Sequence, residues 1–189
     1  IHLVRQVSAY AHKKEPEPQN RALKILFVAC SPQGVSVLDF EEEEEAIFDI
    51  TRNLPVDMDV EDTGSLKGLE TQLEYNEYDI IHLTGHADID EEGPYFCMET
   101  EEGFKDKVRP AQLWKILKKG ASSPRLLFLS GCRTGQTPRA AFSFAHSLVA
   151  EHGPPVVGWG LPVSDPAAIE AAKKLYHELG RGKSITDAV

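Results

Sequence analysis

The chain has 189 residues, of which 41% are hydrophobic, and its formal net charge is -10 at pH 7. This length and composition suit one ordinary α/β domain with a substantial core. The negative charge argues against direct nucleic-acid binding and against binding to anionic membranes, and it favours basic partners or substrates. No apolar run approaches the roughly 20 residues that a membrane helix needs.

The first residues are expected to precede the main domain. Apolar residues recur at helical spacing in Ile1–Lys14, and a Pro-rich, extended linker follows at Glu15–Pro18. The chain begins with Ile rather than Met, and its last predicted helix is cut off at Val189. The sequence therefore predicts a longer polypeptide, with the end of a preceding helical region and a linker over residues 1–20 and one domain over residues 21–189.

Strands and helices are then predicted in alternation. Leu23–Ala29 is an apolar strand, and Asp39–Asn53 is a helix whose run Glu41–Glu45 is acidic. We interpret that run as a solvated helix face, with an acidic docking edge as the alternative. Val56–Val60 is predicted as a short edge strand, and Ser65 as the N-cap of the next helix.

The second half of the chain continues the alternation. Its predicted elements are a central strand at Asp79–Thr84, an acidic turn-rich segment at Asp88–Gly93, a hairpin arm at Tyr95–Thr100, a helix opened by Pro110, a buried strand within Arg125–Gly135, a helix at Arg139–Glu151, a strand at Pro155–Trp159, a helix at Ala167–Leu179 capped by Asp165, and a helix from Ser184. This order predicts a mostly parallel sheet with helices on both faces.

Two of these strands end in a glycine followed by a reactive side chain. The strand Asp79–Thr84 runs into Gly85 and His86, and the strand within Arg125–Gly135 runs into Gly131 and Cys132. The carboxyl ends of parallel strands are where open α/β sheets build their sites. Alone, the cysteine is as easily a packing residue and the histidine a loop residue. Together they favour a cysteine nucleophile with an imidazole base.

A cysteine nucleophile also needs N–H groups that stabilise an oxyanion and room for the substrate backbone near the sulfur. An oxyanion needs two backbone N–H groups, and the N–H of Cys132 and that of the residue after His86 are the candidates. Gly85, Ala87 and Gly131 are small enough to let a substrate backbone approach. No Asp or Asn is placed by the sequence to orient the histidine, so the prediction is a dyad.

The segments HLTGHA, FLSGCRTG and VVGWGLPVSD together resemble the CHAT branch of the caspase-like cysteine peptidases. The resemblance extends from about Arg21 to Val189 and implies a caspase-like three-layer α/β/α sandwich. It implies that His86 is the base, that Cys132 is the nucleophile, and that the N–H groups of Ala87 and Cys132 form the oxyanion hole.

The resemblance also implies a substrate-binding set: Gly85, Ser130, Gly131, Trp159 and Asp165. Several relatives with basic specificity carry Asp two residues before the cysteine, whereas this chain carries Ser130. We therefore expect no absolute demand for Arg or Lys before the scissile bond. Core packing is the competing interpretation for Trp159, and helix capping is the favoured one for Asp165.

The expected function is that of a cysteine endopeptidase acting on a protein substrate, with a catalytically silent, peptide-binding module as the alternative. The resemblance implies an upstream helical-repeat region, such as TPR repeats, and activation by a protein or RNA-guided complex, as in bacterial defence or signalling. The sparse set Cys30, Cys97 and Cys132 suggests free thiols in a reducing, cytoplasmic compartment. No cofactor or metal is expected, because a zinc site from His82, His86 and Cys132 lacks a fourth ligand.

Overall fold

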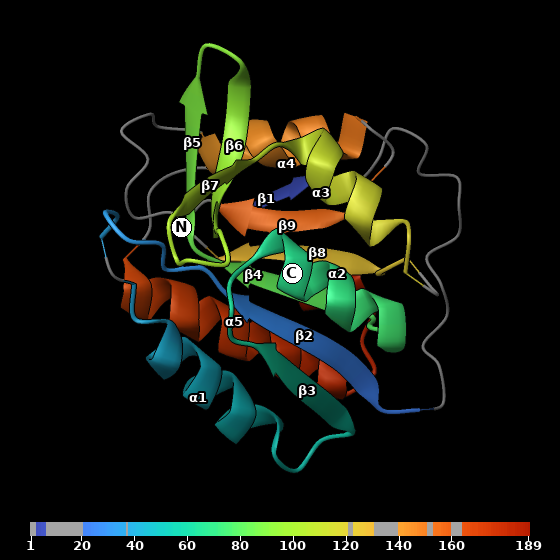
Figure 1. Ribbon diagram of the computed structural model, residues 1–189. Helices are drawn as coiled ribbons and strands as arrows, with labels where there is room; N and C mark the ends of the chain where they lie inside the picture. The colour runs from blue at the N-terminus through green and yellow to red at the C-terminus, as the bar shows by residue number, and fades with distance from the viewer. Residues whose placement is uncertain are drawn as a thin grey trace.

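The computed structural model describes residues 3–6, 21–36, 38–120, 123–130, 140–150, 153–159 and 164–189. In these residues the strands form two sheets, one of six strands in the order β1-β9-β8-β4-β2-β3 and one of three in the order β5-β6-β7. Figure 1 shows the larger sheet at the centre of the molecule and the smaller one extending from the end of its strand β4.

Five neighbouring strands of the central sheet run parallel, and β1 pairs antiparallel with β9 at one edge. Their bounds are β1 Leu3–Gln6, β9 Val156–Trp159, β8 Leu126–Ser130, β4 Ile80–Thr84, β2 Leu23–Ala29 and β3 Val56–Glu61. Every residue of β4 and β8 is buried, as expected for parallel strands that are covered on both faces.

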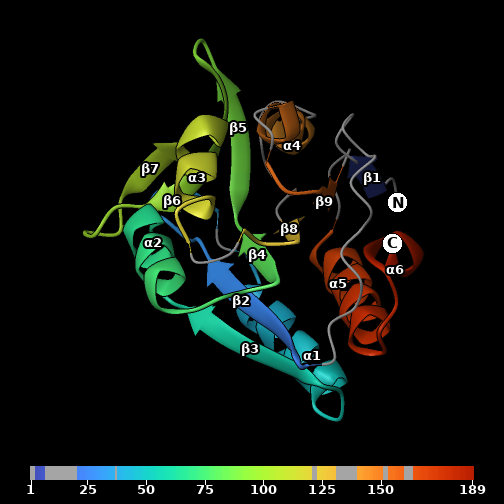
Figure 2. The same cartoon turned by 90° about the vertical axis from the view of Figure 1, so that its right-hand side faces the viewer.

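Side chains alternate between two cores along these strands. Ile80 and Phe128 point to one core, which they share with α1 (Phe40–Thr51), α5 (Asp165–Gly180) and α6 (Ile185–Ala188). Ile81 and Leu127 point to the other core, which is covered by the helices α2 (Leu66–Tyr75), α3 (Pro110–Leu117) and α4 (Ala140–Ala150). Figure 2 shows these helices on opposite sides of the sheet. The predicted three-layer α/β/α architecture is confirmed.

The smaller sheet consists of β5 (His86–Asp90), β6 (Gly93–Glu99) and β7 (Lys105–Val108), paired antiparallel. It begins directly after β4, with only Gly85 between them. Its apolar face, including Phe96, Met98 and Val108, joins the core under α3 and α4. The small sheet is therefore packed onto the larger one at the end where β4 and β8 finish (Figure 1).

Three local predictions are corrected by the structure. Leu3–Gln6, expected in a helix, form β1 and pair with β9, so backbone pairing in the sheet overrides the helical spacing of the apolar residues. Asp88–Asp90, expected in the turn-rich segment Asp88–Gly93, belong to strand β5, because β6 supplies a pairing partner, and the turn is confined to Glu91 and Glu92. The N-cap of α5 is Ser164, and Asp165 is the first helical residue.

Other predictions are confirmed. Val56–Glu61 form an edge strand of the central sheet. Ser65 caps α2, since its hydroxyl accepts a hydrogen bond from the N–H of Gly68 at 2.9 Å. Pro110 occupies the first turn of α3, where its missing N–H leaves no gap in the helical hydrogen bonds.

Candidate active site

The first residue of β5, His86, lies at the end of the central sheet and is buried. Its ring nitrogen Nε2 is 2.7 Å from the carbonyl oxygen of Ser36, in the connection between β2 and α1. A carbonyl can only accept, so Nε2 carries the proton and donates it. In the neutral imidazole the basic nitrogen is then Nδ1. A backbone carbonyl thus orients the histidine, in the place where the sequence offered no carboxylate or amide.

Gly85 allows β4 to turn into β5 against closely packed neighbours. A Cβ atom at this position would lie 2.9 Å from Cε1 of Phe96 and 3.1 Å from Cβ of Cys30, closer than a side chain can be accommodated without a shift. The Gly85 N–H donates to the carbonyl oxygen of Ser130 at 3.0 Å. The structure therefore brings together Gly85 and Ser130, two residues of the predicted substrate-binding set.

The end of β8 faces the end of β4 in the sheet. Thr84 pairs with Ser130 in the parallel register, and His86 and Cys132 each follow two residues later in the sequence. Gly131 and Cys132 lie outside the described residues. Ala87, the residue predicted to donate the second oxyanion N–H, is the second residue of β5 and is buried.

The other two described residues of the predicted substrate-binding set, Trp159 and Asp165, lie in the core and at the start of a helix. Trp159 is buried among the residues that α1 and α5 cover, with its ring at 6.3 Å and edge-on to the ring of Phe128. Asp165 lies in the first turn of α5, where a carboxylate interacts favourably with the helix dipole. The packing interpretation of Trp159 agrees with this position, whereas Asp165 lies one residue after the N-cap, Ser164, and does not cap the helix.

The sequence did not predict a buried polar network that includes Ser130, the last residue of β8, and His82 in β4. The carboxylate of Glu43, in α1, accepts a hydrogen bond from the hydroxyl of Ser130 at 2.5 Å. Its Oε1 is also 3.3 Å from Nε2 of His82, whose Nδ1 is 2.8 Å from the hydroxyl of Tyr176 in α5. All four side chains are buried.

Burial by itself raises the pKa of the Glu43 carboxyl, but its neighbours outweigh that effect. The contact with His82 and hydrogen bonds from Ser130 and Thr84 favour the carboxylate, so the net pKa is lowered. Burial, followed by the Glu43 charge, raises the pKa of Tyr176, which stays a neutral phenol. Glu43 is therefore an ionised group inside the protein, close to the end of β8.

The acidic run Glu41–Glu45 is thus only partly the solvated face that the sequence predicted. Glu43 points inward because it lies three residues after Phe40 and four before Ile47, on the stripe of α1 that faces the sheet. That spacing, together with a histidine inside an otherwise apolar strand, is the sequence signal for the network.

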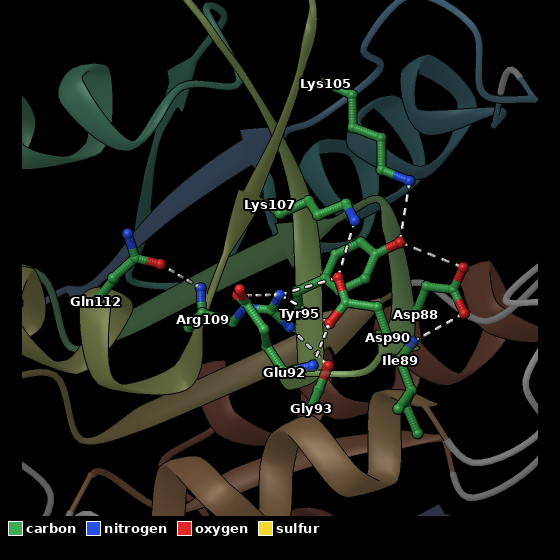
Figure 3. Close-up of polar contacts among 10 residues, drawn as sticks. All are labelled: Asp88, Ile89, Asp90, Glu92, Gly93, Tyr95, Lys105, Lys107, Arg109 and Gln112. Atoms are coloured by element: carbon green, nitrogen blue, oxygen red, sulfur yellow. Dashed lines mark hydrogen bonds and ion pairs between the residues drawn. The ribbon is translucent and has the colours of Figure 1, made fainter.

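A second polar cluster covers the outer face of the small sheet (Figure 3). Lys105, Lys107 and Arg109 lie 4.9, 4.9 and 5.1 Å from the ring centre of Tyr95. Asp90 binds Lys107 and Arg109, each at 2.8 Å, and these contacts, with the hydrogen bond from Lys107 the largest effect, lower its pKa to about 2. The cluster links the three strands of the small sheet, in which His86 is the first residue of β5.

The two described cysteines are poor candidates for the nucleophile. Cys30 and Cys97 are buried, and burial is the main cause that raises the pKa of each thiol. Cys97 lies opposite His86 in the β5–β6 pairing, so proximity to the base alone does not make a reactive thiolate.

The two strand histidines do not share a site. His82 faces the core between the rings of Phe27 and Phe128, whereas His86 contacts Ser36. No group of three or more potential metal ligands occurs among the described residues. Within the same part of the chain, no helix is both long and apolar enough to cross a lipid bilayer.

Comparison with known proteins identifies the family. A search of curated proteins found no match. The family model of the CHAT domain matches residues 3–189, which include both sheets and all six helices named above. The central sheet and its two helical layers agree with a caspase-like fold. The chain therefore belongs to the CHAT-domain family of the caspase-like cysteine peptidases.

Proposed function

We propose that the protein is a cysteine endopeptidase in which His86 and Cys132 form the catalytic dyad. The observation that carries the proposal is the setting of His86. Its Nε2–H is held by the Ser36 carbonyl, which leaves Nδ1 as the base, and the preceding residue is hydrogen-bonded to Ser130, two residues before Cys132 in the sequence.

In the proposed reaction Nδ1 of His86 takes the proton from the thiol of Cys132. The thiolate attacks the carbonyl carbon of the scissile peptide bond, and the N–H groups of Ala87 and Cys132 stabilise the oxyanion. When the intermediate collapses, the amine leaves with the proton from His86, and a thioester remains. Water then loses a proton to His86 and attacks the thioester, which releases the carboxylic acid and the thiol.

No carboxylate lies two residues before Cys132 in the sequence, because Ser130 occupies the position where basic-specific relatives carry Asp. Substrate binding therefore does not depend on a carboxylate at that position. The nearby carboxylate of Glu43 is occupied by donors from the protein itself. We therefore propose that the substrate is a protein segment without an obligatory Arg or Lys before the scissile bond. A peptide library that showed strict basic preference would contradict this.

We also propose that activity is switched by an upstream helical region or by a partner, protein or RNA-guided, in the cytoplasm, as in bacterial defence. His86 is fixed by Ser36 and by the close packing at Gly85. A switch is therefore expected to act without displacing the histidine.

An electrophilic peptide probe tests the enzyme against the silent binding module. We expect a peptidyl acyloxymethyl ketone to label Cys132, and His86→Ala to slow labelling about 10²-fold or more, because the thiolate loses its base. Cys30 and Cys97 serve as internal controls, since burial raises the pKa of both thiols. Equal labelling of all three cysteines, located by mass spectrometry, would support the silent module.

The same probe tests switching. Labelling of Cys132 is expected to be slower in the intact polypeptide without its partner than in residues 1–189. Equal rates would leave the upstream region as a tether only.

A further inference from the structure

The buried network around Glu43 is not used by the proposed reaction and requires its own explanation. Glu43 is 4% exposed, and its carboxylate faces Ser130, Thr84 and His82. An ionised group at such a site costs desolvation energy, and well-packed apolar residues often stabilise a core as well or better. A role in stability alone therefore explains its presence poorly.

The network reaches across four elements on one face of the central sheet. Tyr176 comes from α5, His82 from β4, Glu43 from α1 and Ser130 from β8. The His82 ring is held between Phe27 and Phe128, with ring centres 4.8 and 4.7 Å away. Since His82 cannot move easily, its Nε2, 3.3 Å from Oε1 of Glu43, helps to fix the place of the carboxylate, which in turn holds the Ser130 hydroxyl.

Ser130 is the last residue of β8 and the last described residue before Cys132. A hydrogen bond of 2.5 Å from a hydroxyl to a carboxylate is a strong, charge-assisted one. On the other side of the site, Ser36 contacts His86 from the segment that leads into α1. The start of α1 and the connection before it thus contact both the proposed base and the strand leading to the proposed nucleophile.

We propose that Glu43 is a positioning residue: through Ser130 it fixes the end of β8, and hence the chain that carries Cys132, relative to His86. This inference rests on the proposed dyad. The alternative role, an anionic pocket for a basic substrate side chain, does not fit a carboxylate that is buried and already has internal donors.

The direct test is steady-state cleavage by Glu43→Gln in the intact polypeptide. Gln keeps the size of the side chain but removes the charge that holds both Ser130 and His82. We expect kcat to fall about 10- to 100-fold, as small misplacements of reacting groups do, with KM nearly unchanged. Glu45→Gln is the matched control, because it removes an exposed carboxylate of the same helix, and it should cleave normally.

Ser130 supplies the second arm of the test. Ser130→Ala should lose activity to a similar extent, and Ser130→Thr, which keeps the hydroxyl, should restore much of it. Because the two residues act through one contact, the losses in Glu43→Gln/Ser130→Ala should be far from multiplicative. Activity of Glu43→Gln within about twofold of wild type, or losses that multiply, would overturn the proposal.

Hydrogen exchange separates this proposal from the dyad itself, since it needs no substrate. In Glu43→Gln the amides at the end of β8 should exchange faster, while those of β3 keep their rates. If wild type fails to cleave, the proposed function fails, and the exchange result still decides the role of Glu43. Unchanged exchange at the end of β8 would refute that role.

Discussion

At the scale of single residues, the site depends on side chains that are small or absent. Gly85 lies between the ring of Phe96 and Cβ of Cys30 and still donates its N–H to Ser130. The sequence predicted Gly85 as a point of substrate approach. The structure adds that the glycine is needed for packing, which could not be foreseen because Phe96 and Cys30 come from other segments of the chain.

Gly85→Ala is expected to destabilise the protein by about 1–3 kcal/mol, the usual cost of overpacking a close contact. The cost should be smaller in a Phe96→Leu background, because the ring carbon 2.9 Å from the new Cβ is then removed. Urea denaturation of wild type, Gly85→Ala, Phe96→Leu and the double variant measures how far the two changes in unfolding free energy depend on each other. An equal cost of Gly85→Ala in both backgrounds would contradict the assigned clash.

At the scale of elements, most strands and helices were predictable because their hydrophobic spacing or terminal residues are local signals. Ser65 as a cap, Pro110 in a first turn and the edge strand from Val56 are examples. Strand β5 was not predicted, because its residues after Ala87 are largely acidic and its structure comes from pairing with β6. The burial of Glu43 was not predicted, because an acidic run is normally solvent-exposed, and this general expectation hid the position of Glu43 on the apolar face of the helix.

The charged cluster on β5, β6 and β7 gives the small sheet a predictable pH dependence. The pKa of Asp90 is lowered to about 2 in the folded protein, below its value of about 3.9 in an unfolded chain. A lowered pKa means that the carboxylate stabilises the fold above about pH 4, and that this contribution disappears as the pH falls towards 2.

Asp90→Asn should therefore be less stable than wild type at pH 7, and the difference should shrink between pH 4 and about pH 2. The matched control is Glu92→Gln, since the Glu92 side chain is 83% exposed and forms an ion pair with Arg109 at the rim of the cluster, so its effect should be smaller. Denaturation midpoints across this pH range provide the measurement. A difference for Asp90→Asn that stays constant down to pH 2 would show that the ion pairs do not stabilise the sheet.

At the scale of the whole molecule, the fold brings two distant segments to one end of a parallel sheet. That arrangement was predictable, because strands and helices alternate along the sequence and two of the apolar strands run into Gly-His and Gly-Cys. The match to the CHAT family confirms the architecture. The connection from β2 to α1 was not predictable as part of the site. Its Ser36 contributes a backbone carbonyl, which leaves no signature in the sequence.

The central claim is that His86 and Cys132 act together to cleave proteins. Its most direct test is to incubate a native proteome with wild type, Cys132→Ala or His86→Ala and to count the new protein N-termini over time. Cys97→Ala is the control, because Cys97 faces the strand of His86 but its thiol has a raised pKa. Circular dichroism verifies that each variant is folded.

Wild type and Cys97→Ala should generate a common set of new N-termini, whereas Cys132→Ala and His86→Ala should each generate none above background. The double variant should be no worse than either single one, since the two residues act as a unit. A folded Cys132→Ala or His86→Ala protein that produces the wild-type termini at near wild-type rate would contradict the account.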